Sequence, residues 1–296
     1  SAKHEQSVGS ILPKSLSELI QTYSSLEKNI TSKTSFKEIK KSFSIKNNDK
    51  IFTTYPNTAL YSPIPYIAQT TGIIAGRIFN APPLLLLYIA RIFNLILYCI
   101  LGYYAIKSTP YLKLAIFLIL LCPMNISLAA SCSTDAALIG AGILFFAKIL
   151  QYTFEKEKLS VKNYILLCAL LIITALTKHN FYLFPLVFLI PKEKFGGKYL
   201  AKAGLIILIP LTLCLLWSYL ISGLYVPLNP DADMYKQIDF IIHNPLKYII
   251  ILVISTIVKI FRLYITSIGV LGWQDTRLDN LTYIIYPILI WLSLIY

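Results

Sequence analysis

The sequence predicts an all-α fold, a polytopic membrane bundle of about seven or eight transmembrane helices. Hydrophobic residues make up 56% of the 296 residues and charged residues only 14%, whereas about a quarter of a soluble domain is charged. Several apolar runs approach the ~20 residues that a helix needs to cross ~30 Å of hydrocarbon. Because a backbone in lipid must satisfy its own hydrogen bonds, these runs should be helical.

The positive charge and the cysteines fit the same class. The net charge of +13 comes mostly from loops and tails. Lysine and arginine there are typical of the inner membrane surface, so we expect no nucleic-acid partner. Four of the five cysteines fall inside apolar runs, and no CxxC spacing occurs. We therefore expect no disulfide and no metal-thiolate site.

Residues 1–60 form a polar first segment, rich in serine, lysine, asparagine and threonine. Short amphipathic helices are predicted near Leu16–Leu26 and Phe36–Phe43. We interpret the segment as a water-facing loop on the outer side of the membrane. The sequence opens in polar residues and stops inside an apolar run at Tyr296, which indicates a fragment of a longer membrane protein.

Residues 61–82 are predicted to form an interfacial helix. Two prolines and two tyrosines open it at Tyr61–Tyr66, and the following run to Phe79 is too short and polar for a clear span. Interfacial tyrosines anchor such helices at the headgroup level. Residues 83–296 then form the transmembrane domain. Its first span, Leu84–Ile106, carries Arg91 near its middle, one turn from Asn94.

Two apolar runs, Leu112–Ala130 and Ala136–Phe154, are predicted to form a transmembrane hairpin. The polar turn Ser131–Asp135 joins them and carries a carboxylate at its end. Lys107 and Lys113 flank the preceding turn, which should therefore be cytoplasmic. The Ser131–Asp135 turn then faces the outside.

The segment Asn163–Pro191 allows two interpretations. One continuous helix would export the loop Lys192–Lys202, which has four lysines and a single glutamate. Two short spans would keep that loop inside, in agreement with the charge bias. We favour the two spans, with Lys178-His179-Asn180 at a turn sunk below the outer surface. Each short span needs shielding by neighbours or a thinner bilayer.

The remaining chain continues the pattern. Ala203–Ile221 is predicted to span, and Gly223–His243 forms an acidic exterior loop. Leu246–Ile268 contains two basic residues, and both a span and an interfacial position remain open for it. Leu281–Tyr296 begins a further span.

Three polar positions are candidates for chemistry. Asp135 either caps a helix or binds a metal ion or a sugar hydroxyl at the outer surface. Arg91 either forms a buried ion pair or snorkels, or it binds a phosphate. Lys178 and His179 either occupy an ordinary polar turn or meet the diphosphate of a polyprenyl carrier.

Aromatic and acidic residues in two other loops are weaker candidates for substrate binding. Tyr61, Pro65 and Tyr66 could instead be interfacial anchors. Trp273 and Asp275 could instead be a loop anchor and a cap. No Ser-His-Asp, HExxH, P-loop or GxGxxG pattern appears, so nothing supports a nucleotide-hydrolysing pump.

An ordered set of short motifs resembles a bacterial membrane family catalogued as domain of unknown function 2142. The matching pieces are Gly9–Leu16, Ala59–Tyr66, Ala90-Arg91-Ile92, Pro123-Met124, Ser131–Ala136, His243-Asn244-Pro245 and Gly272–Thr276. That family is similar to the GT-C glycosyltransferases, which transfer sugars from polyprenyl-phosphate donors outside the cytoplasmic membrane. The resemblance implies a catalytic base in a first outer loop that would precede Ser1. It also implies that Tyr61–Tyr66 lies under the active site and that Asp135 is the second acidic position.

The leading hypothesis is therefore a GT-C-like glycosyltransferase of the bacterial cytoplasmic membrane, acting in cell-envelope glycan assembly. Asp135 would assist at the acceptor or at a divalent metal, while Arg91 and Lys178 hold the lipid phosphate. A transporter or flippase of lipid-linked glycans shares the hydropathy and the intramembrane cations. Inverted repeats with broken helices would favour it, and none is visible in the sequence. A non-catalytic membrane scaffold is the third hypothesis.

Overall fold

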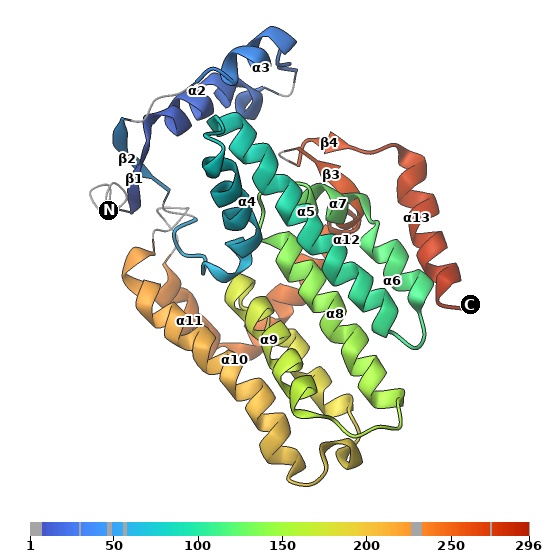
Figure 1. Ribbon diagram of the computed structural model, residues 1–296. Coiled ribbons are helices and arrows are strands. Elements are labelled where there is room, and N and C mark those ends of the chain that lie inside the picture. Colours follow the sequence, from blue (N-terminus) through green and yellow to red (C-terminus); the bar gives the residue numbers. More distant parts are fainter. Residues whose placement is uncertain are drawn as a thin grey trace.

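The protein is a bundle of apolar helices with a small polar head (Figure 1). The computed structural model describes residues 8–29, 31–45, 49–55, 58–225, 233–272 and 274–295. Within these ranges, five helices are long and apolar enough to cross a membrane: Pro83–Ser108, Asp135–Phe154, Val161–Lys178, Tyr199–Leu224 and Pro245–Gly269. The all-α polytopic fold is thus confirmed.

The head combines two helices with a two-stranded antiparallel ribbon, in which Gly9 pairs with Thr54. The elements are β1 (Gly9–Pro13), α2 (Lys14–Lys28), α3 (Phe36–Ser42) and β2 (Lys50–Thr54). Both helices were predicted, whereas the ribbon was not. A capping box starts α3, because Ser35 Oγ accepts from the Glu38 N–H and Glu38 accepts from the Ser35 N–H. The head lies at the end of the bundle formed by α4 (Ile67–Ile78) and α5 (Pro83–Ser108) (Figure 1).

The predicted interfacial segment is a short 3-10 turn, η1 (Ile64–Tyr66), followed by α4 (Ile67–Ile78). The latter packs along α5 (Pro83–Ser108), the first long apolar helix. Pro82 precedes α5, and Pro83 is its first residue. A backbone N–H at this position has no partner within the helix, so the missing N–H of proline costs no hydrogen bond.

The prediction of one continuous helix over Leu112–Ala130 is wrong. The run forms two short helices, α6 (Lys113–Leu120) and α7 (Pro123–Ala129), because Pro123 cannot continue a helix and instead starts a new one. The tyrosine hydroxyl of Tyr98 donates to the Leu120 carbonyl at 2.8 Å. The carbonyl is therefore satisfied inside an apolar region, which makes the break tolerable there.

The centre of the bundle consists of α5, α8 (Asp135–Phe154), α9 (Val161–Lys178) and α10 (Tyr199–Ile221). The core between them consists mainly of apolar side chains, and Phe145 and Leu171 within it are completely buried. Helices α5 and α8 approach closely at Gly140, where a Cβ atom would lie 2.8 Å from Leu101 Cδ1.

The chain turns at Lys178 and His179, as predicted, and His179 ends α9 in the left-handed conformation. The return is a nine-residue 3-10 helix, η2 (Phe181–Leu189), followed by η3 (Lys192–Phe195). The Leu159 N–H donates to the Lys194 carbonyl at 2.8 Å, so the two basic loops lie at the same end of the bundle. A 3-10 helix rises ~2.0 Å per residue, against ~1.5 Å in an α-helix, so nine residues cover ~18 Å.

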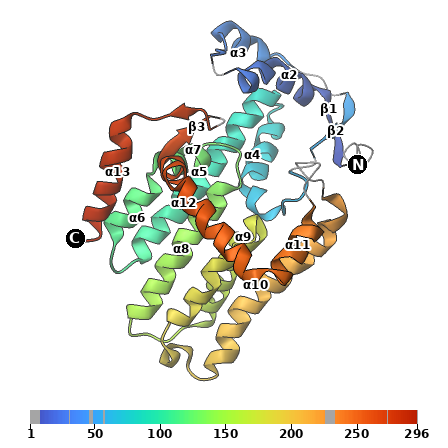
Figure 2. The same cartoon turned by 180° about the vertical axis from the view of Figure 1, so that it is seen from behind.

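The last helices lie apart from this core. After η4 (Ser222–Leu224) come α11 (Met234–His243), α12 (Pro245–Gly269), the ribbon β3–β4 (Val270–Leu271 and Thr276–Arg277) and α13 (Asn280–Ser293). In Figure 2, α12 runs obliquely to α8, α9 and α10. Its last residues contact the region between α6 and α7, where the Cys122 sulfur lies 3.3 Å from the Ile268 carbonyl oxygen. The length and composition of α12 are sufficient for a span.

Fewer described helices reach spanning length than the seven or eight that the sequence predicted. The difference lies in three segments. The run before the Asp135 turn is broken, the segment after His179 is a 3-10 helix, and α13 has only 14 residues.

Candidate functional site

The turn before α8 is held in place by a buried amide from α5. Asn94 is completely buried, and its Nδ2 group lies 2.8 Å from the Ser131 carbonyl, 3.1 Å from that of Ser133 and 3.3 Å from that of Ala129. A buried carbonyl without a donor is costly, so this side chain fixes the path of the turn. From α4, Gln69 Nε2 adds a second bond to the Ser133 carbonyl at 3.1 Å.

Arg91 lies beside the same turn, within the long apolar helix α5. It occupies the third turn of α5, and its Nε donates to the Ala130 carbonyl at 2.6 Å. Its guanidinium carbon lies 5.4 Å from the centre of the Tyr88 ring. Among the described residues, its terminal nitrogens have no hydrogen-bond partner, so they remain able to bind an anion.

Asp135 is the first residue of α8 and carries the central contact of the site. Its Oδ1 lies 2.6 Å from the Lys178 ammonium, and its Oδ2 accepts from the Ser133 hydroxyl at 2.7 Å. The Asp135 side chain is 16% exposed and that of Lys178 is 42% exposed. The pair joins the beginning of α8 to the end of α9, and its lysine remains accessible to solvent.

Two tyrosines from the η1 segment border the ion pair. The rings of Tyr61 and Tyr66 meet edge to face with their centres 6.5 Å apart. Burial raises the pKa of Tyr66, and the neighbouring Tyr61, Asp135 and Cys132 raise it further. The Tyr66 hydroxyl therefore stays a proton donor near the Asp135 carboxylate at neutral pH. Burial also raises the pKa of the Cys132 thiol.

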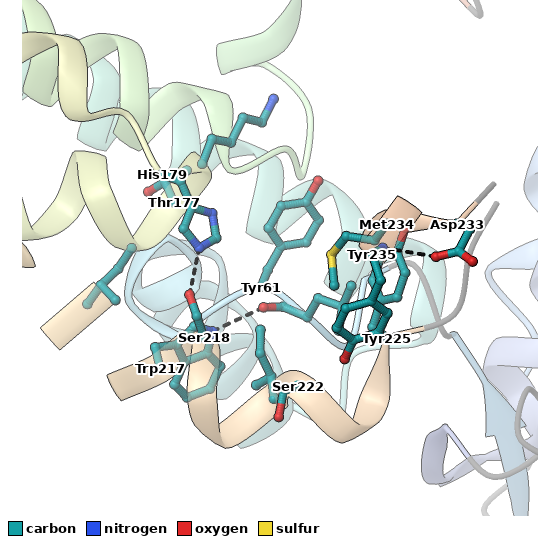
Figure 3. Close-up of a pocket in the computed structure, with 14 residues that line it drawn as sticks. Tyr61, Thr177, His179, Trp217, Ser218, Ser222, Tyr225, Asp233, Met234 and Tyr235 are labelled. Carbon is teal, nitrogen blue, oxygen red and sulfur yellow. Dashed lines mark hydrogen bonds between the residues drawn. The ribbon is translucent and has the colours of Figure 1, made fainter. Parts of the chain in front are cut away.

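A cavity of about 890 Å³ opens beside the Lys178 end of this pair (Figure 3). Its walls come from the end of α9, the end of α10, the start of α11 and the loop before η1. The lining residues are Leu60, Tyr61, Leu176, Thr177, Lys178, His179, Trp217, Ser218, Ile221, Ser222, Tyr225, Asp233, Met234 and Tyr235. The cavity thus combines several aromatic walls with two basic side chains.

Hydrogen bonds between segments hold the cavity wall in shape. His179 Nε2 lies 2.9 Å from Ser218 Oγ, which donates in turn to the Cys214 carbonyl. The Trp217 indole donates to the Leu60 carbonyl at 3.0 Å, which ties α10 to the loop before η1 (Figure 3). Asp233 accepts from the first N–H groups of α11, so this carboxylate serves as a helix cap.

The cavity lining carries charges of both signs, since Lys178 and Asp233 both belong to it. Lys178 has three N–H donors, and one is used by Asp135. Within the described ranges, no cluster of three or more His, Cys, Asp and Glu side chains could hold a metal ion. Besides the Asp233 carboxylate, which caps α11, the lining offers the Lys178 ammonium, the His179 ring and several aromatic side chains.

The structure brings together some, but not all, of the site residues that the sequence predicted. Tyr61, Lys178 and His179 line the cavity, with Tyr66 and Asp135 next to them. Pro65 is buried in η1. Arg91 contacts the Asp135 turn without lining the cavity. Asp275 lies in the β3–β4 turn, where it contacts Thr276 and Leu271, and Trp273 lies outside the described residues.

Sequence reasoning missed the cavity residues on α10 and α11. Trp217 and Ser218 lie near the end of Ala203–Ile221, which was predicted only as a membrane span. The one available signal was the spacing of Ser218 and Ser222, because four residues apart they share one face of a helix. Tyr225 and Tyr235 carried no comparable pattern.

The five apolar helices, the head and the cavity at one end of the bundle define a multi-pass membrane protein. The chain belongs to the family described as "Predicted membrane protein (DUF2142)", whose family model matches residues 2–296. No curated protein and no solved structure matches the chain.

Proposed function

We propose that the protein acts as a membrane glycosyltransferase-like enzyme, using a polyprenyl-phosphate-linked sugar in cell-envelope glycan assembly. The observation that carries the proposal is the Asp135–Lys178 ion pair beside a cavity of about 890 Å³ with aromatic walls and a basic edge. The setting is the bacterial cytoplasmic membrane, with residues 1–60 and the Ser131–Asp135 turn on its outer side.

Lys178 and His179 would bind the phosphate of the donor. Both line the cavity, and both sit at the end of α9 where the chain reverses. A phosphate leaving group gains negative charge as the glycosidic bond breaks, and fixed cations stabilise that charge. The aromatic wall, which includes Tyr61 and Trp217, suits the faces of a sugar ring and an isoprenoid chain.

Asp135 would act on the acceptor. When a donor phosphate competes for the Lys178 ammonium, Oδ1 of Asp135 is released to accept a hydrogen bond from an acceptor hydroxyl and to orient it, while the base that the resemblance implies takes the proton. The hydroxyl oxygen then bonds to the anomeric carbon, and the bond between that carbon and the phosphate oxygen breaks with its electron pair on the phosphate. The family resemblance adds a first-loop carboxylate as the principal base.

The test is sugar transfer by the full-length protein in membranes supplied with a radiolabelled polyprenyl-phosphate sugar. Asp135→Asn should lower the transfer rate roughly tenfold, since it removes a charge-assisted contact to the acceptor hydroxyl while the principal base remains. Lys178→Gln should weaken donor binding about tenfold, since it removes a charge-assisted contact. Asp239→Asn and Lys192→Gln are matched controls, because neither residue lines the cavity. Equal rates in all four variants would overturn the proposal.

A flippase of lipid-linked glycans is the second candidate, favoured by one observation. Transporters use interrupted helices, and the break between α6 and α7 at Cys122 interrupts an apolar run. This break faces α12 and not the cavity, since Cys122 contacts Ser267 and Ile268. Proteoliposomes separate the two activities: movement of the lipid-linked sugar across the bilayer without transfer would favour the flippase.

A further inference from the structure

A second recognition surface lies at the opposite end of the bundle from the Asp135 site. A groove of about 510 Å³ runs between α9 and α10, which pack side by side (Figure 1). Apolar side chains such as Ile165, Ile172, Leu205 and Ile209 form most of its lining, and Lys202 is the only charged residue among the described residues that line it. The groove faces outward, because Ile165 and Leu205 are 63% and 57% exposed.

Lys202 is built into the end of the groove. Its ammonium donates to the Phe195 carbonyl at 2.5 Å and lies 5.7 Å from the centre of the Tyr164 ring. The Tyr164 hydroxyl donates to the same carbonyl at 3.2 Å. One of the three ammonium donors is used in this way, which leaves two for an anion. In the described part of the chain, no acidic side chain lies within 4 Å to form an ion pair with Lys202.

The surroundings of Lys202 are strongly basic. Residues 155–162 and 191–202 together contain seven lysines and three glutamates. The hydrogen bond between Leu159 and Lys194 joins the two stretches at this end of the bundle. Juxtamembrane clusters of lysine attract anionic lipid headgroups, and basic pockets between transmembrane helices bind them specifically.

The length of the groove matches one leaflet. Along α9 it extends from Val161 to Ile172, which is ~16 Å at 1.5 Å per residue. Half of a ~30 Å hydrocarbon core has about this thickness. An acyl chain that lies in the groove therefore places its headgroup at Lys202.

We propose that the α9–α10 groove is a binding site for an anionic phospholipid, with one acyl chain between the helices and the phosphate on Lys202. The site is separate from the Asp135–Lys178 pair and does not depend on the function proposed above. Its occupant is a lipid of the leaflet that contacts the basic loops.

Native mass spectrometry of the full-length protein, titrated in detergent with phosphatidylglycerol or phosphatidylcholine of equal chain length, tests the site. The wild type should retain phosphatidylglycerol at least fivefold more tightly. Lys202→Gln, which can keep the bond to Phe195, should remove that preference, whereas Lys202→Arg should preserve it. Ala169→Phe should fill the groove and lower the affinity for both lipids.

Two controls and a soluble competitor make the test specific. Lys156→Gln changes a lysine of the same loops outside the groove lining, and Leu208→Phe enlarges an exposed residue of α10 outside it. Both should bind lipid like the wild type. Displacement of the lipid by glycerol phosphate alone would indicate a free-anion site. That result, equal binding of both lipids, or an unchanged preference in Lys202→Gln would overturn the proposal.

Discussion

The Lys178 ammonium lies 2.6 Å from Asp135 Oδ1, although 43 residues separate the two in the sequence. The contact closes one end of the α8–α9 pair and fixes a carboxylate at the border of the cavity. Because Lys178 is 42% exposed, solvent screens the pair. Its contribution to stability should be small, so its position at the cavity is the more informative property.

A double-mutant cycle should measure this weak coupling. Asp135→Asn and Lys178→Gln, alone and together, should give an interaction energy of about 1 kcal/mol or less in the free energy of unfolding. Unfolding in mixed micelles with increasing sodium dodecyl sulfate provides the values. A coupling of several kcal/mol would instead indicate a pair shielded from solvent, in conflict with the observed exposure.

Loss of the Asn94 amide should destabilise the protein far more. Asn94→Leu fills a similar volume but leaves the Ala129 and Ser131 carbonyls without the Asn94 donor, and the Ser133 carbonyl keeps only its bond from Gln69. We expect the free energy of unfolding to fall by about 3 kcal/mol. Asn125→Leu, which removes a bond to a single carbonyl, is the control and should cost about 1 kcal/mol or less. Similar losses in both variants would contradict the role of Asn94.

The close contact of α5 and α8 predicts a size-dependent rescue. In Gly140→Ala the new methyl group would lie 2.8 Å from Leu101 Cδ1 and 3.0 Å from Leu101 Cβ. Overpacking of this kind should cost about 1–3 kcal/mol. Leu101→Ala in the same protein should recover part of that loss. Gly204→Ala is the control, because it has open space around it and should be neutral or slightly stabilising. No recovery of stability by Leu101→Ala would contradict a direct contact between Gly140 and Leu101.

The raised pKa of Tyr66 predicts a pH effect. Its folded-state pKa lies above the ordinary value of 10.0, so the folded protein keeps this proton longer than the unfolded chain. The resulting stabilisation is complete below pH ~10 and is lost as pH rises through the folded-state pKa. Tyr66→Phe should therefore lose less stability than the wild type over that interval.

Difference absorbance near the phenolate band, wild type minus Tyr66→Phe, should locate the titration of this one hydroxyl. Asp135→Asn should move that titration to lower pH, because the Asp135 charge contributes to the shift. An unchanged titration in Asp135→Asn would place the two side chains further apart than the structure does.

Local patterns accounted for much of the fold. The apolar run after Pro82-Pro83 predicted α5 to within a few residues, and Ala136–Phe154 predicted α8 nearly from end to end. The lysines of the loop Lys192–Lys202 correctly argued for a chain reversal at Lys178. In each of these cases, the hydrophobic length or the charge bias of a single segment is sufficient for the prediction, because neither depends on how the segment packs against others.

The remaining features depend on contacts between distant segments. Pro123 offered a local signal for the α6–α7 break, but hydropathy outweighed it in the prediction. Asn94 contacts three carbonyls, and Lys178 forms an ion pair with Asp135. Both features follow from the packing of helices that are far apart in the sequence, so no short stretch of sequence predicts them. The same holds for Trp217, whose indole binds a carbonyl 157 residues earlier in the chain.

The support of the Asp135 turn also bears on biogenesis. The donors that satisfy its carbonyls, Gln69, Arg91 and Asn94, all precede the turn in the chain. During translation they leave the ribosome first and are available when residues 129–133 emerge. The order of synthesis therefore presents these donors before the carbonyls that they satisfy, so the polar bend needs no later helix for these hydrogen bonds.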